Sequence, residues 1–187
     1  MSIAQRVRRP ISDTELNRRW EATRHLMKEK NLDIVLTQGN NMFLGGYVRW
    51  FTDIPAESNF HMTVLFPAEG EMTLIRTSAS KIPEWALRGV EKVCYAPFSP
   101  SVHYTADAEA GFAIDYIKKR NPKRIGYIGP ALINSGLIVR VRAASPGVEL
   151  VDITDDFDLI KAIKSPKVTM FCSICPPAYH KMMAVTI

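Results

Sequence analysis

Hydrophobic positions recur at helical spacing near the start of the chain. Ser12 and Glu15 have the spacing of a capping box, in which a serine hydroxyl accepts a hydrogen bond from a backbone N–H three residues further on. The residues that follow place an apolar stripe along one side of a helix, at Leu16, Trp20, Thr23 and Met27. The pattern predicts a helix over Ser12–Asn31 that packs against a sheet.

Short apolar runs bounded by turn residues predict the strands. They cover Asp33–Thr37, Phe43–Val48, His61–Phe66, Met72–Thr77, Lys92–Ala96, Arg124–Gly129 and Val148–Ile153. Pro67 and Gly70 lie in the short connection between the third and fourth runs, which has the length and chemistry of a hairpin turn. An antiparallel hairpin excludes a purely parallel sheet.

Helical patterns alternate with these strands. They predict helices over Ile82–Arg88 and Asp107–Arg120, a third from Pro130 towards Ala144, and a last one that Asp155 or Asp156 caps and that reaches about Lys164. Alternating helices and strands form layers around a sheet. We therefore expect an α/β fold with a mixed β-sheet flanked by helices on both faces.

Length and composition limit the class of protein. The 187 residues suffice for one well-buried domain, and 47% hydrophobic with 23% charged residues is typical of globular proteins. No apolar run approaches the roughly 20 residues that span a bilayer. The first ten residues lack the apolar core of a secretory signal. We therefore expect a cytoplasmic protein with no membrane partner.

The basic balance of the chain raises the question of nucleic acid. The formal net charge is +5, and the densest basic group lies at the end of a predicted helix, at Lys118, Lys119, Arg120, Lys123 and Arg124. Cations there complement the helix dipole, and no aromatic residues are interleaved with them. Nucleic-acid binding is therefore only a minor alternative, and we expect no nucleic-acid partner.

Two clusters of chemically active side chains have a structural explanation. Cys172 and Cys175 form a CxxC pair, but two prolines follow it and only His180 is near as a further ligand, so reduced thiols are expected. The acidic group at Asp152, Asp155, Asp156 and Asp158 falls at a helix start, where acids stabilise exposed amides. Neither cluster predicts a metal site.

Arg49, Trp50 and Phe51 place a planar cation beside two aromatic rings, just after the predicted strand Phe43–Val48. This combination suits a carboxylate or a compact substrate. The alternative is a surface ion pair for Arg49 and packing of Trp50 on the domain. His61 opens the next predicted strand and could face the same cleft. These four residues are the candidate substrate contacts.

Several segments together resemble one known family. NNMFLGGY at Asn40–Tyr47, LDIVLT at Leu32–Thr37, PGVELVDIT at Pro146–Thr154 and DFDLIKAIKSP at Asp156–Pro166 are similar to the N-terminal domain and linker of the creatinase, prolidase and Xaa-Pro aminopeptidase family. The resemblance implies an N-terminal arm at 1–11 and a domain with ribonuclease H-like layering at 12–166. It also implies an atypical tail at 167–187, where a missing catalytic domain would begin.

The resemblance also implies a function. In that family the N-terminal domain is non-catalytic, gates access to the active site and contributes to dimers, and residues near Arg49 reach the partner subunit's active site. The catalytic domain holds two divalent metal ions (Mn, Co or Zn), except in creatinase-type members, through Asp, Asp, His, Glu and Glu. We therefore expect no cofactor in this chain, no activity of the chain alone, a homodimer, and a dipeptide or small-molecule substrate only in the complete enzyme.

The tail carries the main rival interpretation. Asp158 is the last acidic residue, whereas acidic residues normally follow Lys-Ser-Pro in this family. A reading-frame disturbance between about Pro166 and Lys181, or a truncated gene product, would explain the departure. The alternative is a free-standing α/β binding or dimerisation module, in which the apolar segment VTMFCSIC is ordered in an interface.

Overall fold

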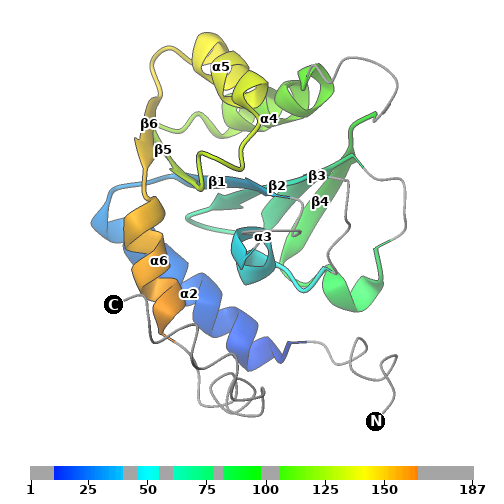
Figure 1. The fold of residues 1–187 in the computed structure, drawn as a ribbon, viewed down its shortest axis with the longest axis vertical. Coiled ribbons are helices and arrows are strands. Elements are labelled where there is room, and N and C mark those ends of the chain that lie inside the picture. Colours follow the sequence, from blue (N-terminus) through cyan, green and yellow to red (C-terminus); the bar gives the residue numbers. More distant parts are fainter. Residues whose placement is uncertain (1–10, 40–45, 55–60, 78–81, 98–105, 164–187) are drawn as a thin grey trace, which may run out of the picture.

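The central feature of the fold is a six-stranded sheet with the strand order β4-β3-β2-β1-β5-β6 (Figure 1). The computed structural model describes residues 11–39, 46–54, 61–77, 82–97 and 106–163. The predictions for residues 1–10 of the arm, for Asn40–Gly45, for Lys164–Pro166 and for the tail at 167–187 lie outside these residues.

The sheet is mixed, as predicted. Its strands are β1 (Ile34–Gly39), β2 (Met62–Pro67), β3 (Met72–Arg76), β4 (Val90–Tyr95), β5 (Arg124–Ile128) and β6 (Glu149–Asp152). β1 pairs antiparallel with β2, and β2 antiparallel with β3, so the predicted hairpin is confirmed. The remaining pairs, β1 with β5, β3 with β4 and β5 with β6, are parallel.

Three helices lie on one face of the sheet: α2 (Asp13–Glu29), α3 (Gly46–Phe51) and α6 (Thr154–Ala162). The predicted stripe of α2 is confirmed, because Leu16, Thr23 and Met27 are buried and Trp20 is partly buried. The Ser12 hydroxyl caps the helix by accepting a hydrogen bond from the Glu15 N–H at 3.3 Å. The core beneath these helices is rich in aromatic rings, namely Tyr47, Trp50, Phe51, Phe66 and Phe157.

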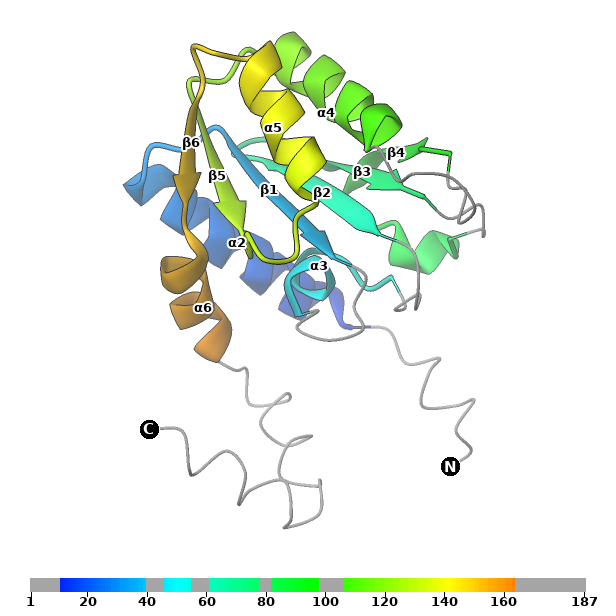
Figure 2. The same cartoon turned by 45° about the horizontal axis from the view of Figure 1, so that its top comes forward.

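Two helices cover the other face: α4 (Asp107–Arg120) and α5 (Ser135–Ala144). Figure 2 shows α4 and α5 on one side of the sheet and α2 and α6 on the opposite side. Their core is made of small and aliphatic side chains, with Ala110, Ala113, Ile117, Leu137 and Val141 against Ile34, Leu36 and Leu65. The predicted layering, with helices on both faces, is confirmed.

The strand predicted over Phe43–Val48 is wrong where it can be compared. Gly46–Val48 belongs to helix α3, which continues to Phe51. Tyr47, Val48, Trp50 and Phe51 recur at helical spacing and are all buried, whereas Gly46 and Arg49 are exposed. A short apolar run fits a strand or a buried helix equally well by its periodicity, and here the helix spacing decides.

Smaller deviations occur at the helix ends. The helix predicted over Ile82–Arg88 is a single 3-10 turn, η1 (Glu84–Ala86), and α5 starts at Ser135, not Pro130, because Asn134 caps it by accepting from the Gly136 N–H at 2.8 Å. The predicted Asp155 or Asp156 cap is also wrong. Those residues lie in the first turn of α6, and the Asp152 carboxylate accepts the Thr154 N–H at 2.9 Å.

No helix in the described ranges is both long and apolar enough to cross a membrane.

Candidate functional site around helix α3

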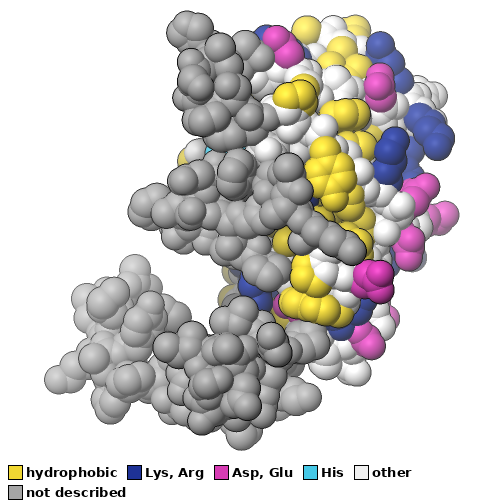
Figure 3. Space-filling view, turned by 90° about the vertical axis from the view of Figure 1, so that its right-hand side faces the viewer, with side chains coloured by type: hydrophobic (Ala, Val, Ile, Leu, Met, Phe, Trp, Pro, Cys, Tyr) yellow, Lys and Arg dark blue, Asp and Glu magenta, His cyan; other side chains and the backbone are white. Residues whose placement is uncertain are grey.

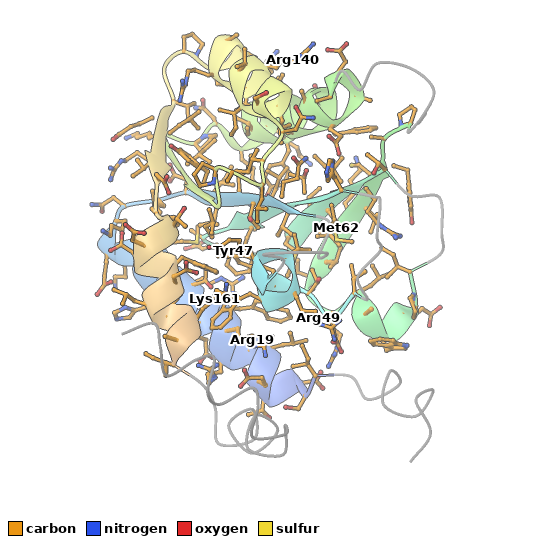
Figure 4. The ribbon with its side chains drawn as sticks, in the orientation of Figure 1. Arg19, Tyr47, Arg49, Met62, Arg140 and Lys161 are labelled. Carbon is orange, nitrogen blue, oxygen red and sulfur yellow. The ribbon has the colours of Figure 1, made fainter. Side chains whose placement is uncertain are left out.

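Helix α3 carries three of the four predicted contact residues. It contacts strands β1 and β2 and helix α2, and its aromatic rings reach α6. In Figure 4, Tyr47 and Lys161 lie on the α6 side of α3, and Arg49 lies on the opposite side. A helix of only six residues cannot be stable alone, so its position is fixed by what it buries.

Phe157 of α6 anchors the buried side of α3. Its ring lies 6.0 Å from the ring of Tyr47, 5.7 Å from that of Trp50 and 5.6 Å from that of Phe51, measured between centroids. The edge-on arrangement with Trp50 and the stacked one with Phe51 are geometries that aromatic pairs favour. These contacts hold α3 and α6 together and fix the direction in which Arg49 points.

Tyr47 combines this packing with a polar contact at its tip. Its hydroxyl donates a hydrogen bond to the Asp158 carboxylate at 3.0 Å, and the Lys161 ammonium lies 3.9 Å from the ring centroid. Burial, followed by the hydrogen bond to Asp158, raises the pKa of Tyr47 to about 12. The hydroxyl is therefore a donor at any physiological pH.

Trp50 is buried and held by α2. Its indole N–H donates to the Thr23 hydroxyl at 3.1 Å, and the Thr23 hydroxyl donates to the Arg19 carbonyl at 2.9 Å. The guanidinium carbons of Arg19 and Arg18 lie 5.3 and 5.8 Å from the Trp50 ring. These cation–π contacts place two arginines over the rim of α3.

The same arginines are bound to one buried carboxylate. Glu15 pairs with Arg18 at 2.9 Å and with Arg19 at 2.8 Å. Arg19 also donates to the Arg49 carbonyl at 3.3 Å. Glu15 therefore neutralises part of the local positive charge and ties the first turn of α2 to α3.

Arg49 is the residue of α3 whose side chain keeps hydrogen-bond donors unused among the described residues. Its side chain is 46% exposed, and one nitrogen lies 3.4 Å from the Asp53 carboxylate. Among the described residues the guanidinium side chain has no other hydrogen-bond or ion-pair partner. Because the guanidinium has five N–H donors, most of them remain free for a carboxylate from outside the domain.

Asp53 is buried and shared by three donors. Its second oxygen accepts from the Ile11 N–H at 2.6 Å and from Arg88 at 3.1 Å. Arg88 also donates to the Ile11 carbonyl at 2.8 Å and pairs with Asp13. Asp53 therefore joins the segment before α2, the end of α3 and the chain after η1 (Glu84–Ala86), and its link to Arg49 is the longest of its contacts.

The structure separates the four predicted contact residues into two groups. Trp50 and Phe51 are brought together in the core of this chain, so their rings do not face solvent. Arg49 is exposed, and half-buried His61 lies directly before β2, where its carbonyl accepts from the Thr77 N–H at 3.4 Å. The substrate-contact prediction therefore rests on Arg49 and His61.

Sequence reasoning missed Asp53 and Arg88. The signal for Asp53 was present, because Arg49 and Asp53 are four residues apart and such pairs meet on a helix. Because a strand was predicted in place of helix α3, this pair was not recognised. Arg88 could not be found from spacing, since it lies 35 residues from Asp53 in the chain.

A second buried polar group joins the α4/α5 layer to the sheet. The Gln38 amide donates to the Thr63 hydroxyl at 2.9 Å and to the Glu109 carboxylate at 3.4 Å, and its oxygen accepts the Asn134 N–H at 2.6 Å. Each partner comes from a different element, so this group is a structural connection between layers.

The acidic residues near α6 serve structural roles as well. Asp156 pairs with Lys30 at 2.7 Å, and Asp152 accepts hydrogen bonds from the backbone and hydroxyl of Thr154. Within the described part of the chain, no group of three or more His, Cys, Asp or Glu side chains is arranged to hold a metal ion.

Comparison with known proteins shows which proteins share this fold. No model of a protein family matches the chain, and no curated protein matches it in sequence. Solved structures do match it. An Xaa-Pro aminopeptidase from Streptococcus pyogenes is similar with a TM-score of 0.54 and 12% identity, over 79% of this chain and 98% of that one.

Two longer proteins are similar over part of their length. An Xaa-Pro dipeptidase from Bacillus anthracis has a TM-score of 0.58 at 13% identity, and this chain covers 37% of it. An X-Pro aminopeptidase from Thermotoga maritima has a TM-score of 0.58 at 14% identity, with 36% covered. The matches extend over 81% and 78% of this chain. The chain therefore has the fold of the N-terminal domain of Xaa-Pro aminopeptidases and prolidases.

Proposed function

We propose that this chain is the non-catalytic N-terminal domain of a metal-dependent hydrolase of the Xaa-Pro peptidase or creatinase type. The observation that carries the proposal is the fold, which matches about a third of two longer peptidases and nearly all of a shorter aminopeptidase chain. In such an enzyme the domain limits access to the metal site and contributes to a homodimer. A cytoplasmic location is part of the same proposal.

The chemistry of catalysis belongs to the other domain in this proposal. Two divalent metal ions there would polarise the scissile carbonyl and supply hydroxide near neutral pH, except in creatinase-type members. The described residues of this chain provide no comparable set of ligands. What they supply is a scaffold, and on it an exposed cation.

Arg49 is the residue through which the domain would contact substrate. Its guanidinium is exposed, and its contact with the Asp53 carboxylate is long, at 3.4 Å. Its backbone is fixed, because the carbonyl accepts a hydrogen bond from Arg19 and the neighbouring aromatic rings of α3 are buried. A cation on a rigid element, with free donors, binds a carboxylate with less loss of side-chain entropy than a mobile one. His61, directly before strand β2, is the second candidate.

The experiment is a metal titration and an activity assay on the purified chain. Calorimetry with Mn²⁺, Co²⁺ and Zn²⁺ is expected to show no stoichiometric binding, and assays with Xaa-Pro dipeptides are expected to show no hydrolysis above the rate of a denatured sample. Metal-dependent turnover would overturn the proposal. A full-length relative that contains a catalytic domain is the positive control.

A further inference from the structure

Strand β4 (Val90–Tyr95) is the terminal strand on one side of the sheet. It pairs with β3, and the described residues place no strand on its other side. The Val90 N–H donates to the Leu87 carbonyl at 3.1 Å, and among the described residues no strand pairs with the remaining backbone N–H and C=O groups along that side. Such an edge is a template for pairing with another chain unless the protein protects it.

Apolar side chains gather beside this edge. Trp85 of η1 is 39% exposed and Tyr95 of β4 is 51% exposed, and both are large hydrophobic residues. Val90 and Val93 of β4 are half-buried. Figure 3 shows hydrophobic side chains in a band down this face, with basic and acidic groups beside it. A contiguous apolar band bordered by charge is typical of an interaction surface.

A β-bulge determines which way the residues of β4 point. Met72 pairs with Val90 but Thr73 pairs with Lys92, so Glu91 is the extra residue. Val90 and Val93 consequently contact the core on the α2 side of the sheet. Glu91 and Lys92 both line a cleft of about 340 Å³ against α4 on the other side.

This arrangement is complementary to itself under a two-fold rotation. In an antiparallel pair, residues directly opposite each other point to the same face. If the axis lies between Glu91 and Lys92, Glu91 stands opposite the partner's Lys92 on the α4 face, twice in the dimer. Val90 then stands opposite the partner's Val93 on the α2 face, also twice.

We propose that β4 is the dimer interface of this chain, where it pairs antiparallel with β4 of a second copy and joins the two sheets. The occupant is a second copy because both the signs of the charges and the faces of the valines match in one register. Trp85 and Tyr95 lie at the margin of the new contact, where they lose exposed apolar area. The inference rests on the dimer-forming role proposed above and assigns it a surface.

The opposite outcome, a monomeric chain, would also have a physical basis. A bulge and charged side chains are also the means by which proteins prevent edge pairing. In that case Glu91 and Lys92 keep the chain monomeric. The two possibilities differ in how the oligomeric state responds to charge reversal.

The test is sedimentation equilibrium of the full chain and of charge variants between about 1 and 200 µM. The wild type is expected to form dimers. Lys92→Glu places like charges opposite each other at both positions and should weaken dimerisation by about tenfold or more. Adding Glu91→Lys on the same chain reverses both charges and should restore it. Lys118→Glu, on an exposed part of α4, makes a matched charge control that should leave the dimer unchanged.

Three results would overturn the inference. They are a wild-type monomer over the whole range, a dimer unaffected by Lys92→Glu, or a double variant that stays as weak as the single one while circular dichroism shows it folded. Glu91 also pairs with Arg120 at 3.4 Å, so the fold of each variant is checked by its thermal melt. A dimer that is unaffected by these substitutions would refute β4 as the interface, but the chain would still be a dimer as proposed above. The metal titration tests the hydrolase assignment independently.

Discussion

The two faces of the sheet are built from different side chains, and the difference separates scaffold from candidate site. The α4/α5 face is packed with alanine, isoleucine, leucine and valine. The α2/α3/α6 face is packed with aromatic rings whose polar atoms contact neighbours, as Trp50 does with Thr23 and Tyr47 with Asp158. Aromatic rings with polar tips fix direction as well as volume. The face that positions Arg49 is therefore the one on which aromatic rings supply the directional contacts.

The largest expected effect comes from removing the ring at the centre of the aromatic face. Phe157→Ala deletes contacts to three rings and should lower the free energy of unfolding by about 3–5 kcal/mol. Leu159→Ala, on the same helix but 71% exposed, is the matched control and should change it by less than about 0.5 kcal/mol. Urea denaturation measures both. Equal effects for the two variants would show that α6 is not held by this cluster.

A smaller effect is expected where β5 turns beside Tyr47. Gly129 has φ +71°, and a Cβ there would lie 2.9 Å from the Tyr47 ring. Gly129→Ala should therefore cost about 1–3 kcal/mol, from backbone strain and from displacement of the ring. Gly147→Ala has open space around it and should be close to neutral. A neutral Gly129→Ala in thermal denaturation would mean that Tyr47 is not confined as described.

The smallest effect is a pH dependence that comes from Tyr47 on the aromatic face. The folded-state pKa of Tyr47, about 12, is raised above the ordinary 10.0. The resulting stabilisation is complete below pH 10 and is lost as the pH rises toward 12, because the unfolded chain releases the proton first. Stability between pH 9 and 11.5, measured by urea unfolding, should fall less steeply in Tyr47→Phe. Parallel curves for the two proteins would contradict the assigned pKa.

Much of the fold follows from the sequence because its elements have clear periods. The helix over Asp107–Arg120 and the hairpin around Gly70 are found where the spacing predicts them. Helix α3 could not be predicted in this way, since a short apolar run fits either state and only burial against Phe157 selects the helix. The bulge at Glu91 depends on the pairing with β3, which sequence alone does not contain.

The candidate site was predictable in part. Arg49 was identified by residue type, and its role in contacting a ligand stays a prediction. The roles of Trp50 and Phe51 were not accessible, because an aromatic ring that binds substrate and one that fills a core have the same sequence signature. Asp53 and Arg88, far apart in the chain, meet only through the tertiary fold.

The most direct test of the central claim, that this chain is one domain of a larger hydrolase, is to sequence the coding DNA beyond the codon for Ile187. If the claim holds, this DNA, in the same or a shifted reading frame, encodes a catalytic domain with the five metal-binding residues Asp, Asp, His, Glu and Glu. An exception is a creatinase-type sequence, which would preserve the catalytic fold without the metal ligands. Unrelated sequence in all three forward frames would rule out the larger hydrolase and favour a free-standing module.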